Sequence, residues 1–349
     1  MSKRVLVAMS GGVDSSVAAY LLKQEGYVVS GVTMCLGISD AEDDTTRCCG
    51  ADAINDAKSV CKHIGVSHSV LDFSPDMEQV VIENFVSEYV QGRTPNPCVR
   101  CNEYLKFGKL LTYAQKMGFD FLATGHYAKI EEEGGVFLLR RPKDRKKDQT
   151  YFLYCIKKEQ LPFILFPLAG YTKEEVRRIA KKAELPVAAK PQSQDICFIS
   201  GNGYKDFIRA RVGEVPGGDI VTINGTVVGQ HDGIIQYTRG QRGGLRVALG
   251  KPQYVVAVDA EHNRIVIGDK KDLRTRTLIA RDINRLVDAF PQTVCAKIRY
   301  SHTEASCTVR LRDNGSAAVE FEEAQEAITP GQAVVFYDGD TVLGGGSID

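Results

Sequence analysis

The chain has 349 residues, and 44 Lys plus Arg balance 44 Asp plus Glu, so its formal net charge is zero. This length predicts two or three domains, and the charge balance gives no sign of a polyanion partner for the molecule as a whole. The sequence has neither a secretory leader pattern nor an apolar stretch near the roughly 18 residues of a membrane span, which favours a soluble cytoplasmic protein without membrane partners. Ten cysteines are too few for a disulfide scaffold, so clustered cysteines suggest a chemical role.

The N-terminal residues predict a strand, a glycine-containing loop and a helix in immediate succession. Residues 5–9 are apolar and rich in β-branched side chains, which is typical of a buried strand in a parallel sheet. Apolar residues at helical spacing follow over 17–22, and Gly26 stands where a C-terminal cap would end the helix. The loop Ser10-Gly11-Gly12-Val13-Asp14-Ser15-Ser16 therefore ends on a helix N-terminus, where free N–H groups and the helix dipole favour an anion.

This loop differs from the two commonest phosphate loops. It has no lysine to reach the β- and γ-phosphates, and it lacks the third glycine of the dinucleotide fingerprint. The S-G-G-x-D-S run resembles the pyrophosphate loop of ATP pyrophosphatases, which split ATP into AMP and pyrophosphate and use the AMP to activate an oxygen. The alternative is an ordinary glycine turn capped by Ser15 or Ser16.

Up to about residue 200, strand-like and helical runs alternate. The strand-like runs are 28–34, 67–72 and 119–127, and the helical ones are 51–63 and 77–89. This alternation predicts an α/β fold with a parallel sheet covered by helices on both faces. Gly125 and His126 would then lie beyond the carboxyl end of a strand, where open α/β sheets bind ligands.

Beyond about residue 205, short β-type runs replace this pattern. They cover 219–224, 254–259, 264–268, 295–300, 307–311, 317–321 and 333–337. Turn signals such as Asp313-Asn314-Gly315 and Pro330-Gly331 separate them. Strands at this spacing predict small β domains or barrels.

Two cysteines at C-x-x-C spacing, Cys98 and Cys101, follow a loop stiffened by two prolines. A helix is expected over 103–113, which places Cys101 near a helix N-terminus and beside Arg100, and both features favour a thiolate. The pair alone is consistent with half of a zinc site, a redox pair or two structural thiols, and no second C-x-x-C completes a zinc site. Cys197 is a distant third candidate, and three thiolates with one open position would suit an iron–sulfur cluster.

One segment of this neutral chain is strongly basic. Six of the eight residues from Arg140 to Lys147 are Arg or Lys, and polar and aromatic residues follow over 148–152. Nucleic-acid phosphates with stacked or hydrogen-bonded bases would match such a segment. A solvated loop is the alternative.

Taken together, the motifs resemble the bacterial tRNA-specific 2-thiouridylases, in order from residue 5 to the last residue. The motifs are Ser10 to Ser16, Arg93-Thr94-Pro95-Asn96-Pro97, Cys101-Asn102, Lys106-Phe107, Ala123-Thr124-Gly125-His126-Tyr127, Lys147-Asp148-Gln149 with Tyr151-Phe152-Leu153-Tyr154, Ile196-Cys197-Phe198, Pro330-Gly331-Gln332 and Leu343-Gly344-Gly345-Gly346. The resemblance implies a parallel, doubly wound sheet of the adenine nucleotide alpha-hydrolase type over 1–205. A small central domain over 206–272 and a tRNA-binding C-terminal β-barrel over 273–349 would follow.

The resemblance also implies ATP-dependent 2-thiolation of the wobble uridine, position 34, of Lys, Glu and Gln tRNAs. The C2 oxygen would be adenylated, pyrophosphate would leave and sulfur would attack C2, after the base is flipped out of its stack. The implied ATP contacts are Ala8, Met9, Ser10, Gly11, Gly12, Val13, Asp14, Ser15, Met34 and Gly125, with Asp14 as a Mg²⁺ ligand. The implied tRNA contacts are Asn96, Pro97, Cys98, His126, Lys147, Asp148, Gln149, Arg299, Tyr300 and Gln332, with 96–98 touching the target base.

Two sulfur chemistries remain open. In the family's persulfide route, Cys197 carries the sulfur and Cys101 is the nucleophile that frees it, which leaves a disulfide between them. Many members have an aspartate where this chain has Cys98, and we predict from this departure that Cys98, Cys101 and Cys197 hold a [4Fe–4S] cluster with hydrosulfide on the fourth iron. The sulfur donor would be a cysteine desulfurase, a relay protein or free sulfide.

Two other functions compete with this interpretation. A different pyrophosphate-loop enzyme, such as an amidating ligase or another tRNA thiolase, would share the loop, but a ligase would not need Cys101 and Cys197. A non-catalytic RNA- or metal-binding module would show no ATP–pyrophosphate exchange. The other cysteines are expected to be small core residues: Cys35, Cys48, Cys49, Cys61, Cys155, Cys295 and Cys307.

Overall fold

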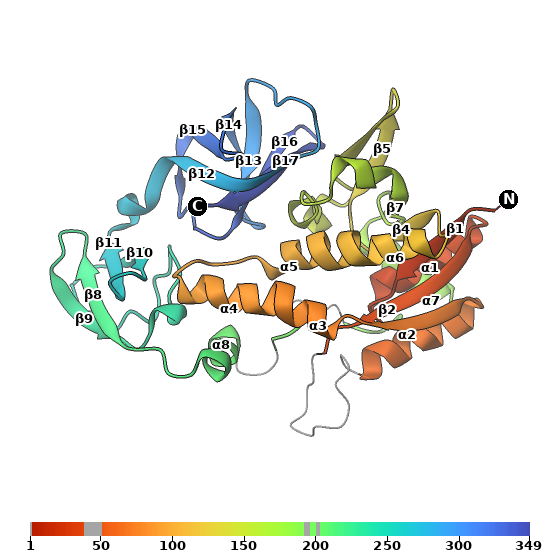
Figure 1. Cartoon of the computed structure of the whole chain (residues 1–349), viewed down its shortest axis with the longest axis horizontal. Coiled ribbons are helices and arrows are strands. Elements are labelled where there is room, and N and C mark those ends of the chain that lie inside the picture. Colours follow the sequence, from red (N-terminus) through yellow and green to blue (C-terminus); the bar gives the residue numbers. More distant parts are fainter. Residues whose placement is uncertain (1, 38–50, 192–195, 200–202) are drawn as a thin grey trace. The chain divides into compact units, whose positions relative to one another are not determined.

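The computed structural model describes residues 2–37, 51–191, 196–199 and 203–349 (Figure 1). The chain forms two compact units, each built from several segments. The first unit comprises Met1–Val81, Cys98–Phe198 and Asp340–Leu343, and the second comprises Ile82–Pro97, Ile199–Gly339 and Gly344–Asp349. This division does not test the domain boundaries predicted after residues 205 and 272, which stay predictions. No helix in the described ranges is long and apolar enough to cross a membrane.

A five-stranded parallel sheet forms the centre of the first unit, with strand order β3-β2-β1-β4-β7. Its strands are β1 (Arg4–Ala8), β2 (Val28–Cys35), β3 (Ser67–Asp72), β4 (Phe121–Ala123) and β7 (Ile164–Leu165). β1 lies in the middle, and its Val5, Leu6 and Val7 are at most 2% exposed, as its continuous apolar run predicts. The strand order reverses direction between β1 and β4, and such a switch point is where doubly wound sheets bind ligands.

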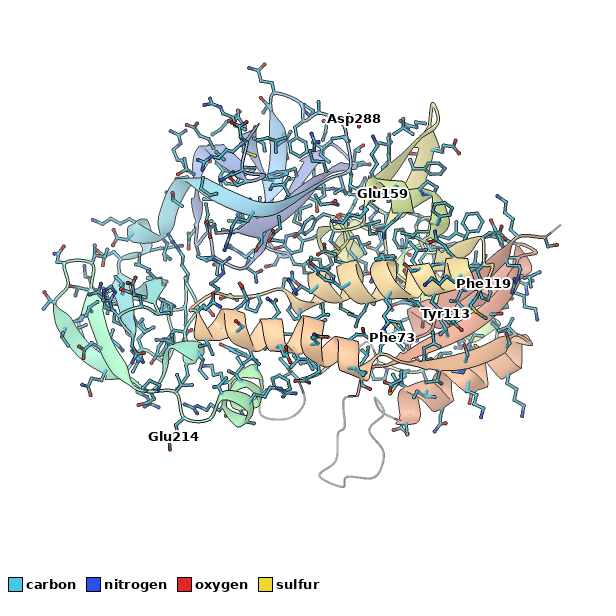
Figure 2. All side chains as sticks on the ribbon, viewed as in Figure 1. Phe73, Tyr113, Phe119, Glu159, Glu214 and Asp288 are labelled. Atoms are coloured by element: carbon cyan, nitrogen blue, oxygen red, sulfur yellow. The ribbon has the colours of Figure 1, made fainter. Side chains whose placement is uncertain are left out.

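Helices cover both faces of this sheet, so the predicted doubly wound α/β class is confirmed. Val5 and Val7 pack with residues of α1 (Val13–Gln24), α2 (Ala51–Ile64) and α7 (Lys173–Lys182) in one apolar cluster. α6 (Leu111–Lys116) packs against β4. The short helix α3 (Ser74–Asp76) follows β3 in the chain. Side chains fill the interior (Figure 2), where Phe73 is 3% exposed and Lys109 lies over its ring.

The helix that carries the C-x-x-C pair begins earlier than the sequence suggests. We expected helix over 103–113, whereas α5 (Pro97–Arg100), a π-helical segment (Cys101–Leu110) and α6 follow one another directly. Proline is well suited to the first helical position, because its missing N–H has no partner there in any case. Cys98 therefore lies in the first turn and Cys101 one turn further along. Another π-helical segment (Met77–Ile82) leads into α4 (Glu83–Val90).

A β-hairpin in the first unit was not anticipated from the sequence. β5 (Lys129–Glu133) pairs antiparallel with β6 (Val136–Arg140), and Gly134 and Gly135 both have positive φ in the turn. Single-turn 3₁₀ segments follow at Arg145–Lys147 and Thr150–Phe152, and a longer one at Lys158–Phe163. The hairpin places Arg140 at the beginning of the basic segment.

The second unit contains a small sheet with strand order β10-β11-β8-β9. The strands of this sheet are β8 (Gly218–Thr222), β9 (Val227–His231), β10 (Tyr254–Asp259) and β11 (Arg264–Gly268). α8 (Tyr204–Val212) precedes them, and 3₁₀ turns lie at Ile234–Gln236 and Lys270–Leu273. Ile220, Val255, Ile265 and Ile267 form its buried core.

An antiparallel barrel of six strands completes the second unit and confirms the predicted C-terminal β-barrel. Its strands are β12 (Arg274–Arg285), β13 (Val294–Lys297), β14 (Ala305–Leu311), β15 (Ala317–Glu326), β16 (Ala333–Asp338) and β17 (Thr341–Ile348). β12 pairs with both β15 and β17, which closes the barrel. At this closure Gly344 has a φ of +142°, and a Cβ there would overlap the carbonyl oxygen of Asn284.

We predict that Gly344→Ala destabilises the barrel by about 2 kcal/mol or more, because the new methyl group meets backbone atoms and strains the glycine conformation. Thermal unfolding of the full chain measures this effect as a lower Tm. Gly243→Ala is the matched control, since a Cβ there has no heavy atom within 4 Å. Equal Tm values for the two variants would contradict the account of the closure.

Candidate active site at the carboxyl edge of the parallel sheet

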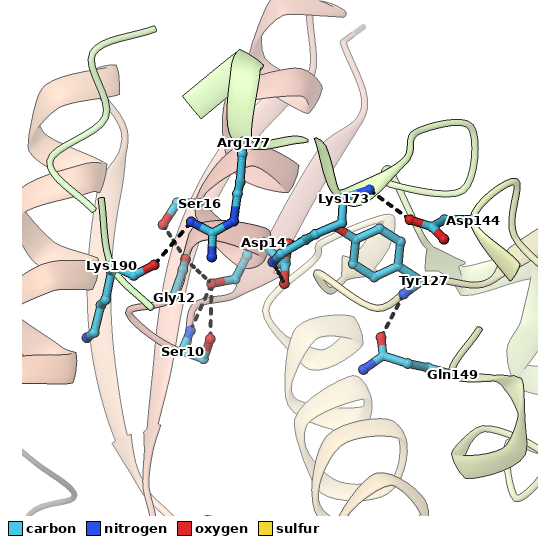
Figure 3. A network of polar contacts seen from close by, with 11 residues as sticks. Ser10, Gly12, Asp14, Ser16, Tyr127, Asp144, Gln149, Lys173, Arg177 and Lys190 are labelled. Atoms are coloured by element: carbon cyan, nitrogen blue, oxygen red, sulfur yellow. Dashed lines mark hydrogen bonds and ion pairs between the residues drawn. The ribbon is translucent and has the colours of Figure 1, made fainter. Parts of the chain in front are cut away.

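The loop between β1 and α1 is held in shape by its own serines (Figure 3). The Ser15 hydroxyl accepts from the Ser10 N–H at 3.2 Å, and the Ser15 and Ser16 hydroxyls donate to the Gly12 carbonyl oxygen at 3.3 and 2.8 Å. Gly12 is the N-cap residue of α1 and has no side chain to cap the helix. The first N–H groups of α1 have no partner within the helix and so remain available to an anion.

Glycines let three chain segments meet at this loop. A Cβ on Gly125, just beyond β4, would lie 2.6 Å from the backbone nitrogen of Ser15. A Cβ on Gly11, whose φ is +67°, would overlap the carbonyl oxygen of Ala53 in α2. Met34 lies near the end of β2, so the structure places the loop, Met34 and Gly125 at one edge of the sheet.

Asp14 is the centre of a polar network. Both oxygens of its carboxylate accept from Lys173 Nζ, at 2.7 and 2.6 Å, and the Tyr127 hydroxyl donates to it at 2.9 Å. Burial, followed by the negative charge of Asp14, raises the pKa of Tyr127 above its ordinary value, so this phenol stays protonated as a donor. The Lys173 backbone N–H in turn donates to Asp144 at 2.9 Å.

Two further cations approach the loop from the chain that begins at α7. Lys190 Nζ donates to the Gly11 carbonyl oxygen at 3.2 Å and to Asp56 at 2.5 Å, and Arg177 donates to the Lys190 carbonyl oxygen at 3.5 Å. No sequence motif distinguishes Lys173, Arg177 and Lys190 as residues of this site. The one local signal is the capping box of Thr172 and Glu175 at the start of α7, which locates the helix but not what its side chains reach.

A second polar cluster surrounds Lys106 on the helix that carries the cysteines. Lys106 Nζ donates to Asn102 at 2.9 Å, and the Asn102 side chain, 1% exposed, donates to the Phe152 carbonyl oxygen at 2.8 Å. Burial and then the charge of Lys106 lower the pKa of His126 well below its ordinary value of 6.5, so this imidazole is neutral at pH 7. Its Nδ1 lies 2.8 Å from the Thr124 hydroxyl.

Cys98 lies in the same electrostatic environment. Its side chain is exposed, yet enough protein surrounds it that desolvation raises the pKa of the thiol, and the lowering effect of Lys106 does not cancel this. Because the helix begins at Pro97, Cys101 lies one turn from its N-terminus, and the thiolate expected there stays a prediction. Cys101 is buried one turn inside the helix, and the Arg100 guanidinium bonds to the Val80 carbonyl oxygen at 3.0 Å.

Cys197 is exposed in the short described segment 196–199. Across the described ranges, no three His, Cys, Asp or Glu side chains are grouped to hold a metal. Cys98, Cys101 and Cys197 therefore do not form a ligand set in this conformation. Among the expected core cysteines, Cys61, Cys155 and Cys307 are buried and Cys295 is half-buried. Cys35 is buried and disulfide-bonded, and Cys48 and Cys49 lie outside the described residues.

Several residues expected to touch tRNA also hold their own segments in place. Gln149 exchanges hydrogen bonds with Tyr127: its side-chain oxygen accepts from the Tyr127 N–H at 2.8 Å, and its N–H donates to the Tyr127 carbonyl oxygen at 3.0 Å. Asp148 accepts from the N–H and hydroxyl of Thr150 at 2.9 and 2.6 Å. These contacts fix the chain beside Lys147.

In the second unit, the barrel holds the residues just before the segment expected to touch the target base. The Gln332 side chain donates to the Thr94 carbonyl oxygen at 2.9 Å, and the Thr94 N–H donates to the Pro330 carbonyl oxygen at 2.8 Å. Arg93 donates to the Ile348 carbonyl oxygen at 2.9 Å. Also in this unit, Arg299 donates to the Glu326 carbonyl oxygen at 3.2 Å, and Tyr300 is 40% exposed.

Carboxylates compensate much of the charge of the basic segment. Arg140 pairs with Glu131 and Glu133, Arg141 with Asp148, Lys143 with Glu175 and Arg145 with Asp340. A pocket of about 320 Å³ nevertheless remains basic, since Lys129 joins four of these cations in its lining against two carboxylates.

Comparisons with known proteins agree along the whole chain. The family model described as a tRNA methyl transferase HUP domain matches residues 3–201. A tRNA methyl transferase PRC-barrel domain matches 205–269, and an aminomethyltransferase beta-barrel domain matches 275–348. The match to a solved complex of a 4-thiouridine synthetase with RNA and ATP is weak: it covers 56% of this chain and 45% of that chain, at 16% identity and a TM-score of 0.36.

Curated relatives are far more similar. The tRNA-specific 2-thiouridylase MnmA 1 of Syntrophus aciditrophicus is 52% identical over 100% of this chain and 93% of its own. The tRNA-specific 2-thiouridylase MnmA of Moorella thermoacetica is 48% identical over 99% of both chains. With half of its residues shared from end to end, the chain belongs to the family of tRNA-specific 2-thiouridylases.

Proposed function

We propose that this protein is an ATP-dependent tRNA 2-thiouridylase that modifies the wobble uridine of Lys, Glu and Gln tRNAs. The observation that supports this most is the pyrophosphate loop at the β1–β4 switch point, in a chain whose relatives carry that activity in their names. The uridine C2 oxygen attacks the α-phosphorus of ATP, and pyrophosphate leaves. This step converts a poor leaving group at C2 into AMP, which is a good one.

The nucleotide site extends along the edge of the sheet. Residues 8–15 bind the phosphates, and Met34 and Gly125 line the adenosine. The carboxylate of Asp14 is the kind of hard oxygen ligand that Mg²⁺ prefers, so it is the residue that would hold this ion. A bound Mg²⁺ would neutralise part of the negative charge of the phosphates. The Tyr127 hydroxyl keeps the Asp14 carboxylate oriented toward the loop.

Sulfur transfer follows at the two cysteines. The terminal sulfur of a Cys197 persulfide attacks C2, and the C2–O bond to AMP breaks. The Cys101 thiolate then attacks the Cys197 Sγ and breaks the persulfide S–S bond, which leaves 2-thiouridine and a Cys101–Cys197 disulfide. A dithiol reductant must reduce this disulfide before the next cycle. A cysteine desulfurase or a relay protein would provide the terminal sulfur of this persulfide by transfer of sulfane sulfur, whereas free sulfide would serve only the cluster alternative.

The tRNA contacts divide between positioning and base recognition. Residues 96–98 touch the flipped uridine, and neutral His126, in the cluster around Lys106, is a further hydrogen-bonding group for the RNA. Contacts to the surrounding RNA come from Lys147, Asp148, Gln149, Arg299, Tyr300 and Gln332. The basic pocket lined by Lys129 and Arg145 offers a further place for a backbone phosphate.

We expect Cys101→Ser and Cys197→Ser each to reduce thiolation of a Glu-tRNA transcript by at least about 100-fold, because each removes a sulfur atom that the transfer needs. ATP–pyrophosphate exchange in the presence of tRNA should persist in both variants, since activation precedes sulfur transfer. Cys295→Ser, a half-buried barrel residue, is the control. ATP–pyrophosphate exchange without any thiolation in wild type would indicate a different pyrophosphate-loop enzyme such as an amidating ligase, and no exchange in wild type a non-catalytic module.

The cluster alternative has its own test. Cys98→Ala should leave thiolation within about threefold of wild type if the persulfide route operates, because Cys98 then takes no part in sulfur transfer. Iron, acid-labile sulfide and visible absorption are measured on anaerobically purified wild type and variant. Stoichiometric iron in wild type that disappears with Cys98→Ala, together with the activity, would establish the cluster and overturn the persulfide route.

We expect Lys129→Gln and Arg145→Gln each to weaken tRNA binding severalfold and to reduce the salt slope of log K by about one, as each phosphate contact contributes about that much. Binding is measured over a series of salt concentrations. Lys181→Gln, exposed in the last turn of α7, is the control. An unchanged slope in both pocket variants would mean that this pocket does not contact the RNA.

A further inference from the structure

The phosphate loop contains no positive side chain. Residues 8–16 include Asp14 but no Lys or Arg, and the backbone N–H groups of a helix start supply only partial charge. A pyrophosphate group carries several negative charges, and its binding in a partly buried site calls for cations close by. The cations must therefore come from another part of the chain.

α7 supplies a lysine whose position is closely fixed. Lys173 is the first residue of α7, and its backbone N–H donates to Asp144. The capping box of Thr172 and Glu175 holds the same turn. From there the side chain, only 13% exposed, places Nζ at 2.6 Å from the Asp14 carboxylate in the centre of the loop (Figure 3).

Two more cations lie on the same side of the loop. Arg177, one turn after Lys173, points from α7 toward the loop in Figure 3, and its guanidinium donates to the Lys190 carbonyl oxygen at 3.5 Å. Lys190 reaches the Gly11 carbonyl oxygen. In the free protein Asp14 pairs with Lys173 and Asp56 pairs with Lys190. A more highly charged anion can replace these carboxylates.

We propose that Lys173, with Arg177 and Lys190, forms the subsite for the β- and γ-phosphates of ATP and for the pyrophosphate that leaves. In the free protein Asp14 holds the Lys173 ammonium in place, and on binding the ammonium moves to a phosphate oxygen. α7 thus provides the lysine that the loop lacks. This subsite rests on the proposed function, because it assumes that the loop binds ATP.

Binding of three ligands to the full chain separates the parts of the site. Isothermal titration uses pyrophosphate, AMP and α,β-methylene ATP, without divalent cation and again with Mg²⁺. Lys173→Met should weaken pyrophosphate and the ATP analogue at least tenfold and leave AMP within twofold, whereas Lys173→Arg should retain most of the affinity. Lys182→Met, at the exposed far end of α7, should match wild type for all three ligands.

Asp14→Asn distinguishes phosphate binding from a merely structural ion pair. Without divalent cation, this variant should bind pyrophosphate severalfold more tightly than wild type, since it removes a repelling carboxylate and frees Lys173. No gain in this variant, or an equal loss of AMP and pyrophosphate in Lys173→Met, would overturn the subsite while leaving the proposed function intact. A wild-type protein that binds none of the three ligands would overturn both.

Discussion

The parallel pairing of β1 with β4 is the constraint on which the site depends. The chain runs from β1 through β2 to β3 on one side of the sheet and returns to place β4 on the other side of β1. The connections that leave β1 and β4 therefore diverge and leave room between them at the carboxyl edge. Gly125 lets the second connection approach the first at Ser15, which brings Tyr127 to Asp14. Binding groups from other parts of the first unit are arranged around this one junction.

The sequence predicted the architecture best where a signal is local and unambiguous. Buried parallel strands are continuous apolar runs, so β1 could be recognised without knowledge of its neighbours. β17 could not be recognised, because Gly344, Gly345 and Gly346 have no side chains to show alternation. Glycine is required at 344 and 346 because the backbone of β12 lies too close for a Cβ. The helix that carries Cys98 and Cys101 begins at Pro97, six residues before the predicted start at 103. A proline can either stiffen a loop or begin a helix, and the sequence does not distinguish these two roles.

The same distinction applies to the site. The anion-binding character of residues 10–16 follows from seven consecutive residues, so it could be predicted. The cations around it come from the chain about 160 residues further on, and only the packing of α7 against α1 brings them to the loop. Nothing in the spacing of Lys173 or Lys190 distinguishes them from the solvated lysines at 181 and 182. Single side chains that meet from distant parts of the sequence can be recognised only once the fold is known, because no local pattern marks them.

The contact between Gln332 and the Thr94 carbonyl oxygen gives the barrel a role in holding the chain that leads to the cysteine helix. Thr94 lies two residues before Asn96 and three before Pro97. The helix that carries both Cys98 and Cys101 begins at Pro97. Arg93 and Ile348 join the same segment to the last strand of the barrel. A substitution at Gln332 or a loss of the last residues would therefore loosen the chain at 93–95, although these residues lie about 240 positions apart in the sequence.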